Sequence, residues 1–182
     1  MSEVIERYQG LCDQFGARVD DAPDDAWTAK APCEGWTARE VVAHIVDAQR
    51  AMVAAITGGA ATPLGADEDP KEAWRSTYAA FKEAVVRPGA LEAQVVTPMG
   101  PMGLETMLGR LHSMDVLVHT WDLARAVGGD ERLDQDAVAH AYQGIKPMDA
   151  MLRRPGLFGD KVESAPGADA QTEFLNFLGR AV

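Results

Sequence analysis

Apolar side chains recur every three or four positions along most of this chain, which is the spacing of amphipathic helices. The pattern predicts an all-α protein with one small extended segment near residues 94–102. The predicted helices cover about residues 3–20, 37–57, 70–87, 104–127, 134–151 and 171–178. Long helices joined by short loops are typical of a helical bundle, here with an extra short C-terminal helix. Since no internal repeat is present, we expect a single domain over residues 1–182.

Polar residues and prolines mark where several of these helices begin and end. Thr37 and Glu40 have the spacing of a capping box, in which each side chain satisfies a backbone amide of the other residue. Asp69 followed by Pro70 predicts another helix start, because proline suits the first helical position. Pro147 predicts a kink or an early end in the fifth helix, because it has no backbone N–H to donate.

Charge and composition exclude some functions. The formal net charge is −11 and the pI is about 4.7. Such a surface repels phosphate backbones, and no cluster of lysine or arginine offsets it, so we predict no nucleic-acid partner. No run of roughly eighteen apolar residues exists, so we predict no membrane span, and because residues 1–7 are acidic and amphipathic we expect no secretory signal there. The cysteines, Cys12 and Cys33, are then expected to be reduced thiols of a cytoplasmic protein.

Two histidines and two aspartates gather near the apolar face of the longest predicted helix. Asp115 and His119 are four residues apart, so they lie one turn apart with Cβ atoms about 5–6 Å from each other and can chelate one ion. His44, on the apolar side of the second helix, is the candidate third ligand. Two imidazoles and one carboxylate leave positions open for water or substrate, as catalytic metal sites do.

The other two polar residues of this helix, His112 and Asp122, are the candidate catalytic residues. Asp122 can accept a hydrogen bond from the free ring nitrogen of a ligand histidine, or it can hold Arg125 on the next turn. His112 can adjoin the ion or act as a base that faces the substrate.

The same residues can also be interpreted as purely structural, without a metal ion or catalysis. His44 can be a satisfied core histidine, and the pairs Asp122–Arg125 and His112–Asp115 can form a buried salt-bridge network. On either reading, Cys33 is interpreted as an inert thiol and Trp36 as a packing residue.

Two segments resemble signatures of a known family. Residues 32–44, PCEGWTAREVVAH, resemble the N-terminal signature of the mycothiol-dependent maleylpyruvate isomerase metal-binding domain. Residues 118–126, VHTWDLARA, resemble its second signature, and residues 97–102, 157–159 and 174–180 are similar to further family segments. The resemblance covers nearly the whole chain in the expected order, and it implies a DinB-like four-helix bundle.

The resemblance also implies a divalent metal ion held by His44, Asp115 and His119. Zinc is favoured, with nickel or iron as alternatives, because all three accept nitrogen and oxygen ligands. The family usually has glutamate where this chain has Asp115, whose carboxylate reaches about 1.5 Å less far. Either the helices lie closer together, a water molecule intervenes, or the metal is bound weakly.

The function that the resemblance implies is a metal-dependent thiol S-transferase or isomerase-like enzyme, with mycothiol as cosubstrate and a small electrophile or thiol as substrate. The isomerase itself carries a further C-terminal domain, and this chain is expected to be too short to hold one, so isomerisation of maleylpyruvate is not implied. The alternative is a non-catalytic metal-binding or stress-related module of the same fold. Bundles of this kind often pair through helix faces, so a homodimer is a further expectation.

Overall fold

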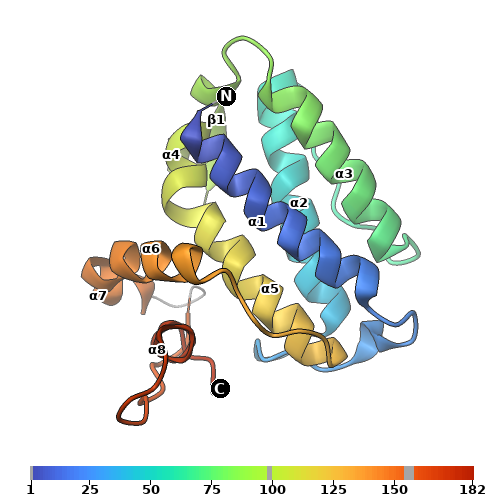
Figure 1. Cartoon of the computed structure of the whole chain (residues 1–182). Coiled ribbons are helices and arrows are strands. Elements are labelled where there is room, and N and C mark those ends of the chain that lie inside the picture. Colours follow the sequence, from blue (N-terminus) through green and yellow to red (C-terminus); the bar gives the residue numbers. More distant parts are fainter. Residues whose placement is uncertain (1, 98–99, 154–157) are drawn as a thin grey trace.

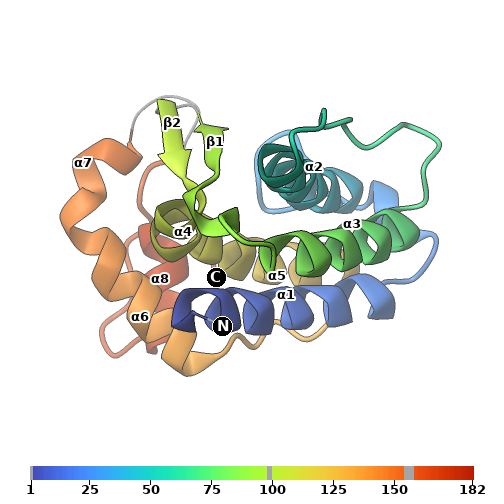
Figure 2. The ribbon, with the colours of Figure 1, turned by 90° about the horizontal axis from the view of Figure 1, so that it is seen from above.

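A computed structural model describes residues 2–97, 100–153 and 158–182. Four helices lie side by side and form the expected bundle (Figure 1). They are α1 (Glu3–Asp21), α2 (Ala38–Thr57), α3 (Pro70–Val85) and α5 (Ser113–Val127). α1 and α2 each pack against both α3 and α5, so the four helices enclose one core, as the view from above shows (Figure 2).

Short elements complete the chain. They are η1 (Ala26–Thr28), η2 (Ala90–Glu92), β1 (Gln94–Thr97), β2 (Gly100–Gly103), α4 (Leu104–Met107), η3 (Leu108–His112), α6 (Gln135–Ile145), η4 (Lys146–Met148), α7 (Asp149–Leu152) and α8 (Ala170–Phe177). β1 and β2 pair in an antiparallel hairpin with Thr97 opposite Gly100, which confirms the predicted extended segment. The expected turns over 98–101 and 157–159 each begin outside the described residues.

The predicted helix ends are confirmed. The amide and the hydroxyl of Thr37 both donate to Glu40 Oε2, at 2.6 and 2.8 Å, and α2 starts at the next residue. The Asp69 side chain accepts from the backbone amide of Glu72 at 2.9 Å and caps α3. α6 ends two residues before Pro147, and the chain continues as the 3-10 turn η4 before α7.

The longest predicted helix differs from a regular α-helix at one place. Residues 104–127 are helical throughout, but η3 is a π-helical stretch between α4 and α5. A π turn has one extra residue, so side chains before and after it are rotated relative to a regular helix. His112, the last residue of η3, is buried. Such turns often occur at functional sites, and this one lies directly before Asp115.

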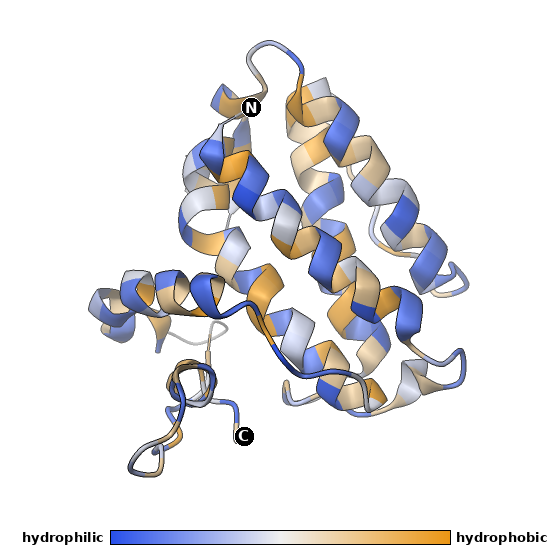
Figure 3. Cartoon of the chain, in the orientation of Figure 1, coloured by the Kyte–Doolittle hydropathy of each residue, from blue (hydrophilic) through white to orange (hydrophobic). Residues whose placement is uncertain are grey.

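Each helix of the bundle carries hydrophobic and hydrophilic residues (Figure 3). The hydrophobic ones fill the core, where Tyr8, Phe15, Ile45, Phe81 and Leu117 are almost completely buried. In the part of the chain that the structure describes, no helix combines the length and the apolar character that a bilayer span requires.

Close packing between α1 and α3 leads to a prediction about Gly16. A Cβ atom at this position would lie 2.7 Å from Trp74 Nε1. That indole is buried and stacked on Tyr78 with the ring centroids 5.2 Å apart, so it has little room to move. Although alanine is the better helix former, we expect Gly16→Ala to lower the free energy of unfolding by about 1–3 kcal/mol, as overpacked cores do. Urea denaturation measures this, with Gly10→Ala as the control because a Cβ there meets nothing within 4 Å. Equal stability of the two variants would contradict the prediction.

The C-terminal third lies beside the bundle rather than in it (Figure 1). α6 packs against α8 and contacts α5. After α8, Gly179 adopts a left-handed conformation with φ of 83°, and the chain turns back toward α5. This turn carries Arg180 into the interior, where it contacts Asp122.

Candidate metal centre

The structure brings His44, Asp115 and His119 together from two helices. His44 Nε2 on α2 lies 2.8 Å from Asp115 Oδ2 on α5. His119 Nε2, one turn further along α5, lies 3.4 Å from Asp115 Oδ1. One donor atom from each residue can be chosen so that all three lie within 4.8 Å of one another. Two imidazole nitrogens and a carboxylate oxygen are therefore directed at the same small region, and this donor set suits zinc, nickel or iron.

The short carboxylate of Asp115 reaches both histidines because α2 and α5 pack directly against each other. His112 Nδ1 lies 3.5 Å from Asp115 Oδ2, while the His112 ring stacks on Tyr8 with centroids 5.6 Å apart. His112 therefore faces Asp115 from inside the core.

Asp122 holds the other nitrogen of His119. His119 Nδ1 lies 2.9 Å from Asp122 Oδ2, so the ring is fixed between two aspartates, one at each nitrogen. Arg180 Nη2 and Nε donate to Asp122 at 2.8 and 3.2 Å, and the Asp122 side chain is completely buried. A carboxylate that orients a ligand histidine through its second nitrogen is a recurrent feature of metal sites.

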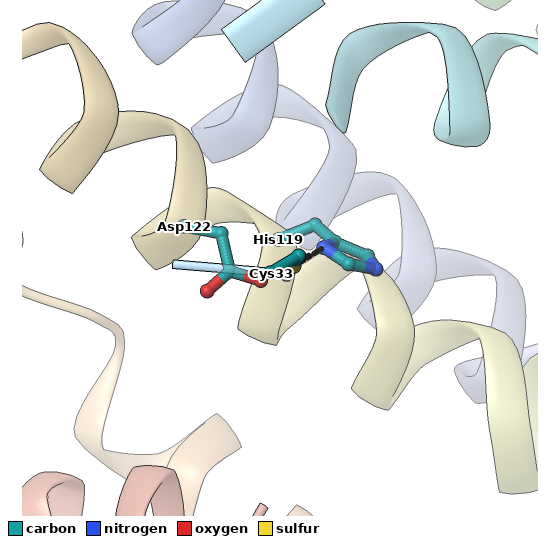
Figure 4. A group of neighbouring side chains, drawn as sticks. All are labelled: Cys33, His119 and Asp122. Carbon is teal, nitrogen blue, oxygen red and sulfur yellow. Dashed lines mark hydrogen bonds and ion pairs between the residues drawn. The ribbon is translucent and has the colours of Figure 1, made fainter. Parts of the chain in front are cut away.

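Cys33 completes this inner cluster (Figure 4). Its thiol donates to Asp122 Oδ2 at 3.2 Å and lies 4.0 Å from His119 Nδ1. Arg180 Nη2 is 3.3 Å from the same sulfur.

The local charges shift three pKa values. Burial favours a raised pKa for Asp115, but the charge of His119 and hydrogen bonds from the three histidines outweigh it and hold the pKa well below its ordinary value. Burial would lower the pKa of His119, but the charge of Asp115 and hydrogen bonds to both aspartates raise it well above its ordinary value. Burial likewise opposes ionisation of Asp122, yet hydrogen bonds from His119 and Arg180 lower its pKa to about 2.

These pKa shifts indicate the protonation state of the metal-free cluster. Both aspartates are ionised at neutral pH, and His119 carries a proton at each nitrogen to face them. If His119 lost the Nε2 proton, its lone pair would face the Asp115 carboxylate without a positive charge between them. A metal cation can replace that proton, because it binds the lone pair and the carboxylate together. The residues present therefore fit a divalent ion on the Nε2 side of His119.

Among the described residues, a second group of possible ligands overlaps the first and consists of Cys33, His119 and Asp122. It uses the Nδ1 side of His119, where Arg180 already neutralises Asp122 and contacts the Cys33 sulfur. A cation at that position would lie beside the guanidinium charge. The group of His44, Asp115 and His119 is therefore the better candidate.

One side of this candidate centre is open. The side chains of His44 and Asp115 are 37% and 23% exposed, whereas that of His119 is only 7% exposed. Trp36 lies over both imidazoles, with its ring centroid 5.2 Å from that of His44 and 5.6 Å from that of His119. The exposed part of the centre is therefore formed by His44 and Asp115, with the Trp36 ring beside it.

The structure corrects one predicted pair and adds residues that the sequence did not single out. The pair Asp122–Arg125 is wrong, because Arg125 instead donates to Glu131 at 2.7 Å and lies over the Trp121 ring. Arg180, and not Arg125, donates to the Asp122 carboxylate. Cys33 and Trp36 lie in the 32–44 segment and Arg180 ends the 174–180 segment, so the resemblance covers all three residues, but it gave none of them a role.

Comparison with known proteins supports this assignment of fold. The family model described as the mycothiol maleylpyruvate isomerase N-terminal domain matches residues 8–124. Uncharacterized proteins from two strains of Mycobacterium tuberculosis are 26% identical over 185 residues, which cover 99% of this chain and 99% of each relative.

Two solved structures share the fold. The crystal structure of the mycothiol-dependent maleylpyruvate isomerase aligns with a TM-score of 0.56 and 16% identity, over 76% of this chain and 68% of that chain. A histidine-to-alanine mutant of that isomerase aligns with a TM-score of 0.69 and 16% identity, over 99% of this chain and 90% of that chain. The second alignment extends past residue 124 into the C-terminal third.

Proposed function

Because the chain belongs to the mycothiol maleylpyruvate isomerase N-terminal domain family, we propose that it binds one divalent metal ion and uses it to activate a low-molecular-weight thiol of the mycothiol type. The observation that carries the proposal is the convergence of His44 Nε2, the Asp115 carboxylate and His119 Nε2 on one partly exposed region. Zinc is the ion we favour, with nickel and iron as alternatives.

When bound, a divalent ion supplies a positive charge that lowers the pKa of a thiol or water molecule beside it. His44, Asp115 and His119 would hold the ion. Asp122 would keep a proton on His119 Nδ1, so that Nε2 is the nitrogen that exchanges its proton for the ion. Arg180 keeps Asp122 ionised and in place. Since His112 is buried behind Asp115, we assign it to positioning that carboxylate and not to direct contact with substrate.

The reaction that this arrangement favours is transfer of the thiol to a small electrophile. The thiol loses its proton to solvent, its sulfur forms a bond to the electrophilic carbon, and the leaving group departs with the bonding electrons. The Trp36 ring beside the open face suits a flat or apolar substrate.

The experiment that tests this function measures consumption of mycothiol with chlorodinitrobenzene as the electrophile, in which the carbon–sulfur bond replaces the carbon–chlorine bond. Protein loaded with zinc, nickel or iron is compared with metal-free protein. We expect the metal-loaded protein to accelerate the reaction, and Asp122→Asn to reduce the rate by about 10–100-fold, as loss of such a supporting carboxylate does. Bound metal without any acceleration for mycothiol would instead support the non-catalytic metal-binding module.

Two further parts of the proposal concern the localisation and the oligomeric state of the protein. Cys12 and Cys33 are both free thiols, which fits a reducing cytoplasm. We also propose that the chain forms a homodimer, which light scattering of the purified protein tests directly.

A further inference from the structure

A cavity separate from the candidate metal centre lies between α1, α5 and α6. α6 meets α5 and reaches α1 through the contact between Arg7 and His140. The cavity has a volume of about 340 Å³, which is within the range of small-molecule sites. Its floor consists of the buried side chains of Leu11, Met114, Leu117 and Ile145. An apolar body of limited size would therefore be shielded from water there.

The rim of this cavity is basic, in contrast to the acidic protein around it. Arg7, Arg110 and His140 line it, and all three residues are exposed. No aspartate or glutamate is among the described residues that line the cavity, although the whole chain has a net charge of −11. The acidic residues nearby line an adjoining depression on the other side of Arg7 and His140, namely Glu6, Asp134 and Asp136.

The two arginines of the rim are free to bind an anion. Within the described part of the chain, neither Arg7 nor Arg110 forms an ion pair. The contact that Arg7 does form is with His140 Nε2, at 2.8 Å, and it joins a cation to an imidazole rather than to a carboxylate. Guanidinium groups bind carboxylates through paired, charge-assisted hydrogen bonds.

We propose that this cavity binds a small organic anion with an apolar body, such as a medium-chain monocarboxylate. The apolar part lies on the floor formed by α1, α5 and α6, and the carboxylate lies at the rim beside Arg7 and Arg110. The site is on the α6 side of α5, whereas the candidate metal centre is on the α2 side.

Gly144 offers a way to close the cavity without disturbing the core. It lines the cavity on α6, and a Cβ atom added there meets nothing within 4 Å. Leucine is also the better helix former, so Gly144→Leu is expected to fold and to fill the space. Gly144→Ala is the matched control, because one methyl group leaves most of the cavity open.

The test is calorimetric titration of the metal-free full chain with octanoate and with octanol. We expect saturable binding of one octanoate per chain, clearly weaker binding of octanol, and loss of binding in Gly144→Leu but not in Gly144→Ala. The double variant Arg7→Gln/Arg110→Gln should weaken octanoate binding by about tenfold, the equivalent of one charge-assisted hydrogen bond. His44→Ala should bind octanoate as the unchanged protein does, which shows that the carboxylate is not bound at the metal ligands. The proposal is overturned if octanoate does not bind, if octanol binds equally well, or if Gly144→Leu binds octanoate unchanged.

Discussion

Replacing His44 or His119 by alanine is expected to abolish stoichiometric metal binding. Each substitution removes one of the three proposed ligands, and the two that remain cannot hold the ion in a three-ligand site. Elemental analysis of protein that has been dialysed against zinc measures the effect. We expect about one zinc per chain in the unchanged protein and close to none in either variant.

Cys33→Ser is the matched control for this experiment, because it separates the two overlapping groups of possible ligands. His119 belongs to both groups, whereas His44 belongs only to the first and Cys33 only to the second. We expect Cys33→Ser to retain zinc. Loss of zinc in Cys33→Ser together with retention in His44→Ala would place the ion on the Nδ1 side of His119. That result would contradict the assignment of His44, Asp115 and His119 as the ligands.

The affinity for zinc should also fall as the pH is lowered. His119 has a raised pKa in the metal-free protein because it faces two ionised aspartates, and its Nε2 proton must leave before a metal can bind. Lower pH favours the protonated form, so the proton competes more strongly with the ion.

Replacing Arg180 by methionine is the change with the largest expected effect on stability. Asp122 is completely buried, and its carboxylate has its only guanidinium partner among the described residues in Arg180. Removing one member of a buried ion pair leaves an uncompensated charge and typically costs about 3–5 kcal/mol. For a domain of this size that corresponds to a fall in melting temperature of roughly 10 °C. Urea and thermal unfolding of the metal-free protein measure both quantities.

The double variant Asp122→Asn/Arg180→Met shows whether the charge itself is responsible. It removes both charges and keeps similar volumes, so we expect it to recover part of the stability lost in Arg180→Met. A single variant that stays within about 1 kcal/mol of the unchanged protein, as exposed pairs do, would contradict this account of the pair.

Local signals in the sequence predicted much of the fold. The spacing of apolar residues predicted the four bundle helices, and Thr37 and Asp69 predicted where two of them begin. Such features depend on residues close together in the chain. The π-helical stretch η3 was not predicted, because a helix with regular periodicity was assumed over residues 104–127. Its last residue, His112, is buried and stacks on Tyr8.

The sequence predicted the residues of the candidate centre that lie on the predicted helices, but not the contact from the C-terminal third. Asp115 and His119 share a helix face, so their proximity follows from their spacing. His44 was predicted as the third ligand from its place on the apolar side of the second helix, and the resemblance implied the same residue. Arg180 follows Asp122 by 58 residues, and its position depends on how the C-terminal third packs beside the bundle. No periodicity encodes such a contact, so the sequence suggested only Arg125, three residues away from Asp122, as a possible basic partner.

Crystallography of the zinc-loaded protein at the zinc absorption edge tests the central claim most directly. We expect one anomalous peak with His44 Nε2, His119 Nε2 and an Asp115 oxygen at about 2.0–2.2 Å from it. The absence of a peak between these three side chains, or a peak beside Cys33 and Asp122 instead, would contradict the account.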